Sequence, residues 1–424
     1  MRDSHKKRIR VRSKIYFFLL FFEGALRKWV LPGFAAPLLI VRDPIAIWML
    51  YLATSTGIIV INDYIKVIWG ITAVAFFTTL IFGHGNLVVA LYGFRITAFH
   101  FPLIFILARI LTREDVQKAG EVLLKINIAM TLLVAIQFFS PQTAWVNRGV
   151  GGEEGSGFMG AADYFRVPGT FSFTNGLSLF YGLVAPFILY FWISGQKRKP
   201  AFRILLIIST VCLLAAIPLS VSRTVLFEIV ITLIFLLAAG SSSRALWGRL
   251  IMTVVFGSVI LMILQNFSFF KTATFVFTER FTSANEQEGG VEGVFLDRFL
   301  GGMIGAIGGY GDSPFWGHGL GMGTNAGAKL MSGNIQFLIA EQEWGRLIGE
   351  SGILLGMGMI LVRCYLTYKL LKLSWSAVGM NNLLPWLLAS FSLLMLLQGQ
   401  WAQPTALGFA ALSVGLTIAA FKVQ

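Results

Sequence analysis

Long apolar segments alternate with short polar connections along almost the whole chain of 424 residues. A helix needs about 20 residues to cross the hydrocarbon core of a membrane, and each segment has close to this length. A backbone inside lipid must satisfy its own hydrogen bonds, so repeated segments of this length predict a helical bundle. About twelve spans are expected, at residues 15–31, 45–61, 67–82, 87–110, 122–139, 168–194, 204–219, 224–240, 250–267, 346–370, 383–400 and 404–421.

The composition supports an integral membrane protein, because 56% of the residues are hydrophobic and only 13% are charged. The fold class expected is therefore all-α and polytopic, with no separate soluble domain. One membrane domain is predicted, made of an N-terminal bundle (1–267) and C-terminal helices (346–424). The glycine-rich, polar stretch between them, residues 268–345, is expected to form one large extracytoplasmic loop. The segment 32–44, between the first two expected spans, is also apolar and is an alternative candidate for entering the membrane, as a re-entrant element.

The N-terminal segment is expected to be a retained span. Its first thirteen residues are strongly basic, and the apolar run that follows lacks a small-residue cleavage site, which argues against a signal peptide. Both cysteines, Cys212 and Cys364, fall in apolar segments, so neither a disulfide framework nor a cysteine metal site is predicted.

Lysine and arginine gather in the connections on one side of the predicted bundle, which places both termini in the cytoplasm. The net charge of +14 is then a signal of topology and argues against nucleic-acid binding. Residues 140–167 and 268–345 form the sizeable outer loops. No glycine-rich phosphate loop followed by Lys-Ser or Lys-Thr occurs, so coupling to ATP is not expected.

Three arginines are candidates for binding a phosphate group near the outer surface. Arg166 precedes the sixth expected span, and Arg223 stands at the turn between the seventh and eighth. Guanidinium groups bind phosphate bidentately and stay charged when partly desolvated. Arg346 opens the tenth span, where pairing with Glu343 on the same helix is the alternative. For Arg166 and Arg223 the alternative is ordinary interfacial snorkelling.

Carboxylates and one histidine are candidates for proton transfer. Glu341 and Glu343 lie at a membrane boundary, where an unpaired charge is costly, and either one is a possible general base. His318 is a further candidate, although its flanking glycines equally suit a backbone turn.

Ionisable residues also occur inside expected spans, where they suggest function by default. Arg95 and His100 would line a substrate or proton path, or Arg95 would pair with Glu23 to hold the bundle together. Glu228, in the eighth span, presents the same choice.

Neither a metal ion nor another cofactor is predicted. The chain has four histidines, no His-x-x-x-His, and no Asp-x-Asp motif on the expected outer face. Glu153-Glu154 is the one adjacent acidic pair on that face, within a glycine-rich linker. A metal-independent mechanism is therefore favoured.

Several motifs together resemble a known family. They are the stretch from Arg166 to Asn175, the Ser222-Arg223 turn, Trp-Gly-His-Gly-Leu-Gly at 316–321, and Gly-Glu-Ser-Gly at 349–352. Their order relative to the spans resembles the O-antigen polymerase and O-antigen ligase superfamily of bacterial polysaccharide assembly. The resemblance implies about twelve spans, one large outer loop and a relationship to the membrane-embedded GT-C glycosyltransferases.

The resemblance also implies a reaction. Arg166 and Arg223 would bind the pyrophosphate of an undecaprenyl-linked glycan donor in the bacterial inner membrane, while the large loop presents a glycan or lipid-linked glycan acceptor. Ligases commonly carry a His-Asn pair where this chain has Glu341 and Gln342, which favours a polymerase of the exopolysaccharide branch. A ligase for lipid A core or protein is the alternative, and a transporter of lipid-linked glycan or solute is the alternative of another class. A flippase and a chain-length regulator are possible partners.

Overall fold

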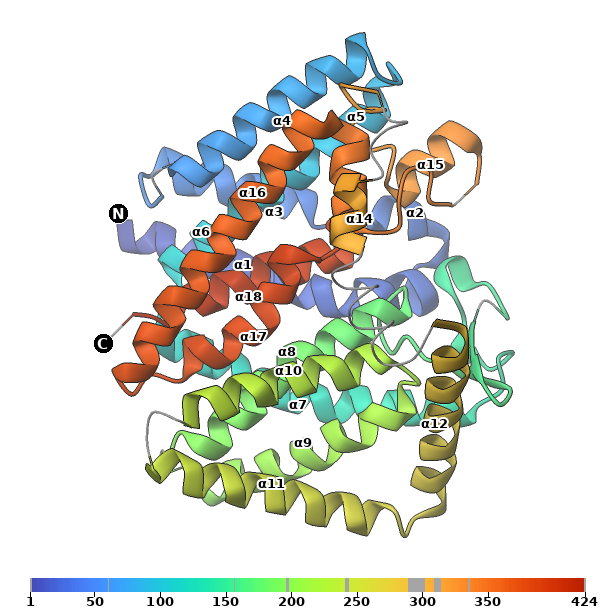
Figure 1. Cartoon of the computed structure of the whole chain (residues 1–424), viewed down its shortest axis with the longest axis vertical. Coiled ribbons are helices and arrows are strands. Elements are labelled where there is room, and N and C mark those ends of the chain that lie inside the picture. Colours follow the sequence, from blue (N-terminus) through green and yellow to red (C-terminus); the bar gives the residue numbers. More distant parts are fainter. Residues whose placement is uncertain are drawn as a thin grey trace.

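Helices lie side by side through most of the chain in the computed structural model (Figure 1). The structure describes residues 2–59, 61–155, 157–195, 198–240, 244–288, 302–308, 314–334 and 336–422. Within these ranges, nine helices are long and apolar enough to cross a membrane. The expected all-α, multi-pass membrane fold is confirmed, whereas the number of twelve spans stays a prediction.

The expected spans correspond to the following elements. They are α1 (Arg2–Ala25) with η1 (Leu26–Val30), α3 (Asp43–Ser55), α4 (Asp63–Ile81), α5 (Leu87–Arg95) with η3 (Ile96–His100) and α6 (Leu103–Ile110), α7 (Arg113–Phe139), α8 (Thr174–Ile193), α9 (Pro200–Leu219), α10 (Arg223–Gly240), α11 (Arg244–Leu264), α16 (Glu343–Gly379), α17 (Leu384–Leu397) and α18 (Pro404–Ala419). The last two are shorter apolar helices. Residues 32–44 hold η2 (Pro32–Phe34) and α2 (Ala35–Leu38), so this stretch is broken before α3 begins.

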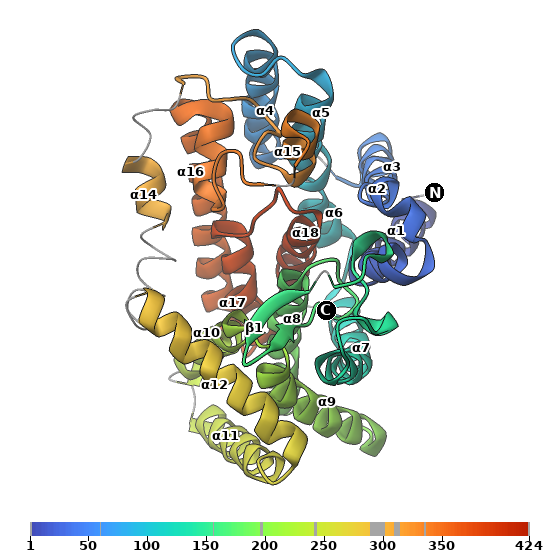
Figure 2. The ribbon, with the colours of Figure 1, turned by 90° about the vertical axis from the view of Figure 1, so that its right-hand side faces the viewer.

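The two ends of the bundle differ. Both termini lie at one end, and the other end carries the polar loops (Figure 1). The loops hold the short helices η4 (Trp145–Asn147) and η5 (Val150–Gly152), a hairpin of β1 (Phe158–Ala161) and β2 (Tyr164–Arg166), and the helices α12 (Ser268–Glu288), α14 (Gly302–Gly308) and α15 (Asn325–Ser332). Helix α12 lies across the ends of neighbouring helices and packs against α9 and β1 (Figures 1 and 2).

Helix α8 is the centre of the bundle. Almost every one of its residues is buried, and α7, α9, α10, α11, α17 and α18 pack around it. Helices that share a lipid environment associate mainly through close packing, since lipid is as apolar as their side chains. The enclosure of α8 fixes its first turn, at Thr174 and Asn175, in the polar end of the bundle.

The β-hairpin holds Arg166 in a defined position. Its strands are antiparallel, Ala161 pairs with Tyr164, and Phe158 pairs with Arg166. The two turn residues, Ala162 and Asp163, both have positive φ, of 47° and 61°. A type I′ turn, whose twist matches that of the flanking strands, requires positive φ at both of these positions.

Helix α16 bends sharply at Gly352, which has φ 76° and ψ 169°. Glu343 and Arg363 are twenty residues apart on this helix, which in a straight helix is about 30 Å. Their side chains nevertheless lie 2.7 Å apart, so the first turns of α16 fold back against the rest. The bend leaves carbonyl groups open to the loop before it: the His318 amide donates to the Gly349 carbonyl (2.7 Å), and the Gly319 amide to the Glu350 carbonyl (2.9 Å). Two motifs recognised in the sequence, 316–321 and 349–352, therefore form one structural unit.

Replacing Gly352 by alanine should destabilise the protein. Its φ and ψ lie in a region that is essentially restricted to glycine, where another residue costs about 1–3 kcal/mol. A Cβ atom would also overlap the Phe315 carbonyl. We expect a lower midpoint of thermal unfolding in detergent for G352A. The control is G379A on the same helix, where a Cβ meets no atom within 4 Å. Equal midpoints for the two variants would contradict this account of the bend.

Candidate functional site

A cavity of about 860 Å³ opens among the polar loops, at the end of the bundle opposite the termini. Figure 2 looks onto this end of the protein. Residues of β2, the first turns of α8 and α10, helix α12, the start of α16 and the connection between α17 and α18 form its walls. Ligand pockets of proteins commonly measure about 300–1,000 Å³, so this cavity has room for a sizeable ligand.

Three arginines line the cavity, each from a different element. Arg166 ends β2, Arg223 is the first residue of α10, and Arg280 lies on α12. The structure thus brings together the two arginines predicted at 166 and 223, and it adds a third that the sequence analysis missed. The sequence feature that could have pointed to Arg280 is the charged Glu279-Arg280 pair in the expected large loop. Buried Ala273 and Val276 hold α12 against the protein, and Arg280 is one turn beyond Val276.

The turn before Arg223 has an unusual backbone. Val221 has φ 48°, a left-handed conformation that is an outlier for a β-branched residue. It is 1% exposed, and the Ser222 hydroxyl is hydrogen-bonded to that of Ser178 on α8 at 2.9 Å. Such conformations persist where the surroundings over-determine them, and they often occur at functional sites. The tight turn starts α10 with Arg223 at the cavity wall.

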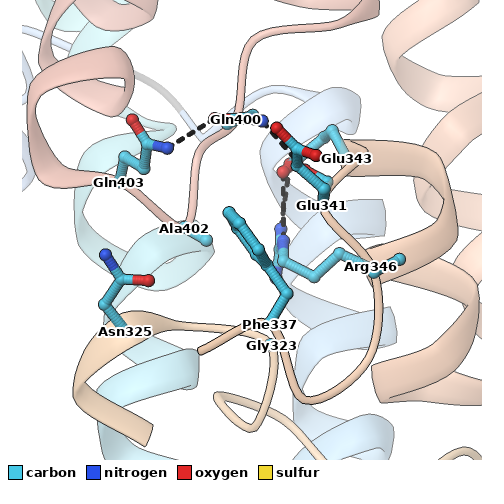
Figure 3. Close-up of a pocket in the computed structure, with 10 residues that line it drawn as sticks. Gly323, Asn325, Phe337, Glu341, Glu343, Arg346, Gln400, Ala402 and Gln403 are labelled. Atoms are coloured by element: carbon cyan, nitrogen blue, oxygen red, sulfur yellow. Dashed lines mark hydrogen bonds and ion pairs between the residues drawn. The ribbon is translucent and has the colours of Figure 1, made fainter. Parts of the chain in front are cut away.

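Glu343 is enclosed by arginines (Figure 3 shows its contact with Arg346). Its Oε1 accepts hydrogen bonds from Arg346 Nη2 (2.9 Å) and Arg363 Nη1 (2.7 Å), and its Oε2 accepts from Arg346 Nε (3.0 Å) and the Trp401 amide (3.1 Å). Arg346 Nη1 also donates to Glu350 Oε2 at 2.6 Å. All four charged side chains are at most 5% exposed.

This cluster bears on two of the predicted site residues. The Glu343 carboxylate already accepts four hydrogen bonds, so it has little capacity to act as a general base. Arg346 is held between two carboxylates, an arrangement that favours a structural role over pyrophosphate binding. The pairing of Glu343 with Arg346, which the sequence offered as the alternative, is confirmed. Arg363 was missed because it reaches Glu343 only across the bend of α16.

Amide side chains form another part of the wall. Gln400 donates to the Glu341 carbonyl (2.8 Å), Gln403 donates to the Gln400 side chain, and Asn175 donates to Gln403 Oε1 (3.2 Å). Figure 3 shows Gln403 directed toward Gln400, which lies next to Glu341. The Glu341 side chain is exposed and lines the cavity. The sequence feature that could have pointed to these amide groups is the glutamine-rich sequence Gln-Gly-Gln-Trp-Ala-Gln at 398–403.

The hydrogen bonds that His318 forms with Gly349 and His84 are made by its backbone. Its amide donates to Gly349, and its carbonyl accepts from the His84 amide at 3.1 Å. The residue does not belong to the described lining of the cavity. The structural alternative, a backbone turn between glycines, is the arrangement found, and a catalytic role is not favoured.

Arg95 is not among the described residues that line the cavity, and its contacts favour a structural role over substrate binding. Its Nη1 contacts both carboxylate oxygens of Asp43 at 2.9 Å. Asp43 Oδ1 also lies 2.9 Å from His100 Nε2, and His100 Nδ1 lies 2.9 Å from the Tyr16 hydroxyl. The alternative partner, Glu23, instead contacts Arg27 and Arg42. Asp43 was overlooked because it follows the apolar stretch 32–42.

Among the described residues, no group of three or more His, Cys, Asp or Glu side chains gathers in a way that would hold a metal ion. The chain matches no protein-family model, and the comparison with curated proteins found no match.

Replacing Arg363 by methionine should destabilise the protein. The change leaves Glu343 with one arginine partner and removes donors from the carbonyls of Leu396 (2.6 Å) and Gly399 (3.1 Å). Breaking a buried pair by removing one partner costs about 3–5 kcal/mol. We expect a loss of about 3 kcal/mol in the free energy of unfolding, measured by denaturant titration in detergent. K372M, at an exposed position of the same helix, is the control. Similar curves for both variants would show that the cluster contributes nothing.

Proposed function

We propose that this protein is a metal-independent transferase that moves a glycan from a lipid-linked pyrophosphate to an acceptor, at the outer face of the bacterial inner membrane. In its most specific form, the proposal is polymerisation of undecaprenyl-pyrophosphate-linked repeat units into O-antigen or exopolysaccharide. The observation that carries it is the cavity at one end of a membrane bundle, with three arginines on its walls beside carboxylate and amide groups.

The arginines suit a pyrophosphate. Arg166, Arg223 and Arg280 come from three elements and line one cavity, so their guanidinium groups can act on the same anion. Arginine presents a planar set of donors that matches phosphate oxygens bidentately. Positive groups fixed where negative charge develops stabilise a departing pyrophosphate.

The reaction requires a nucleophile and a proton acceptor. The oxygen of an acceptor hydroxyl attacks the anomeric carbon of the donor sugar, and the bond from that carbon to the pyrophosphate oxygen breaks. The electron pair of the broken bond leaves with the lipid pyrophosphate. The hydroxyl proton passes to a carboxylate at the cavity wall. Of the two carboxylates predicted for this role, Glu341 is the one that remains without an arginine partner among the described residues.

The remaining walls suit a glycan. Asparagine and glutamine side chains both donate and accept hydrogen bonds, as sugar hydroxyls do. Asn175, Gln400 and Gln403 lie beside aromatic residues, including Phe337 and Trp344, in the same cavity. A few polar groups set among apolar and aromatic surfaces are typical of a site that orients a ligand.

The proposal is tested by deleting the gene and sizing the polysaccharide and the lipid-linked intermediates by mass spectrometry. Loss of a polymerase leaves single repeat units on the lipid carrier. Long chains that stay on the carrier would indicate a ligase instead. If neither intermediate accumulates, glycan transfer is excluded and transport becomes the better explanation.

Replacing Arg223 by alanine should abolish chain growth without lowering the amount of protein in the membrane. Loss of one positioned donor to a developing anion commonly costs about 10²–10³ in rate. R223K should recover little, because lysine lacks the bidentate geometry. The measurement is polysaccharide length in the complemented deletion strain, with protein level by immunoblot. The matched control is R148A, since Arg148 pairs with Glu154 outside the cavity lining. Normal chains from R223A would remove Arg223 from the site.

A further inference from the structure

Glu228 is a buried carboxylate at the cavity wall. It lies on α10, is 5% exposed and lines the same cavity as the three arginines. Its Oε2 accepts no hydrogen bond, and no lysine or arginine of the described residues forms an ion pair with it. A buried polar atom without a partner is uncommon in native structures and costs free energy.

The other buried carboxylates of the described chain all have arginine partners. Glu23 pairs with Arg27 and Arg42, Asp43 with Arg95, and both Glu343 and Glu350 with Arg346. Ionisable groups within membrane helices are expensive and are normally compensated in this way. Glu228 differs from the rest, and as a residue it lines the cavity. A ligand bound in the cavity can therefore supply the partner that the described residues do not.

The neighbouring helix is shaped to accommodate this side chain. Gly182 of α8 faces Glu228, and a Cβ at position 182 would overlap the Glu228 carboxylate, with the Phe391 ring also close by. Glycine inside a helix costs about 0.5–1 kcal/mol relative to alanine. The packing of α8 against α10 thus requires a weak helix former at the one position where the carboxylate needs space.

Glu228 also lies deeper along α10 than Arg223, at a distance that leaves room for a pyrophosphate. It is five residues beyond Arg223 on α10, which corresponds to about 7.5 Å along the helix axis. A carboxylate at that separation does not compete directly with a pyrophosphate held by Arg223. Glu228 is buried, whereas the side chain of Glu341 is exposed.

We propose that Glu228 hydrogen-bonds the acceptor hydroxyl and takes its proton when the hydroxyl oxygen attacks the donor sugar. The inference rests on the proposed function and names the catalytic carboxylate of that same site. The new bond joins the acceptor oxygen to the anomeric carbon, the bond from that carbon to the pyrophosphate breaks, and the proton ends on Glu228. Glu341, the carboxylate considered above for this role, would then contact the glycan at the cavity wall instead.

The decisive variant is E228Q, which keeps the shape of the side chain and removes its ability to take a proton. General-base catalysis typically contributes about 10²–10⁴-fold. We expect kcat to fall by at least about 10²-fold, with little change in KM for the donor. The assay uses purified protein in nanodiscs and lipid-linked repeat units extracted from the deletion strain. E153Q, an exposed glutamate outside the cavity lining, is the control.

A measurement of thermal stability distinguishes a loss of catalysis from a loss of folding in these variants. Because Glu228 has no internal cation partner, E228Q should unfold at the same temperature as the wild type or at a higher one. G182A should lower activity while the carboxylate is still present, because the added methyl group displaces it. A full rate for E228Q overturns the assignment of Glu228 while the proposed function stands. No elongation by the wild-type protein itself overturns the proposed function, whatever the variants do.

Discussion

The contact on which the site most depends is the one between Glu343 and its two arginines. A charge buried in a membrane bundle is normally compensated, and here the compensation comes from Arg346 and Arg363, which lie on either side of the bend in α16. Arg363 also holds carbonyls at the end of α17, and the Glu343 carboxylate accepts from the Trp401 amide. Together these contacts set the distance between the start of α16 and the connection at 398–403, which form one wall of the cavity.

The fold was largely predictable from the sequence, because the length of an apolar segment is a direct physical requirement for crossing lipid. Helices lie at the expected positions, and the described helices of the long polar stretch, α12, α14 and α15, lie at one end. The bend at Gly352 was not predictable, since glycine is tolerated inside helices and only the contact with Phe315 shows that it is required here. The pairing of Arg95 with Asp43 was missed for a related reason: their separation in sequence carries no information about which buried charges meet.

The site was predictable in part. Arg166 and Arg223 stand next to the ends of apolar segments, where sequence places a residue at a known depth, and both line the cavity. Arg280 and the amides at 400 and 403 belong to connections whose course the sequence does not reveal. Glu228 was noted as an ionisable residue in a span, but its lack of a partner is a property of the packed structure. Composition identifies such groups, and only geometry tells compensated charges from uncompensated ones.

The hairpin that carries Arg166 has a tight two-residue turn, and successive side chains of a strand point to opposite faces. A single residue inserted or deleted between Tyr164 and Arg166 would move Arg166 to the opposite face of β2 and turn the guanidinium group away from the cavity. Loops at the surface usually tolerate changes in length. This one does not have that freedom, because the number of residues in the hairpin determines which side of it the charge occupies.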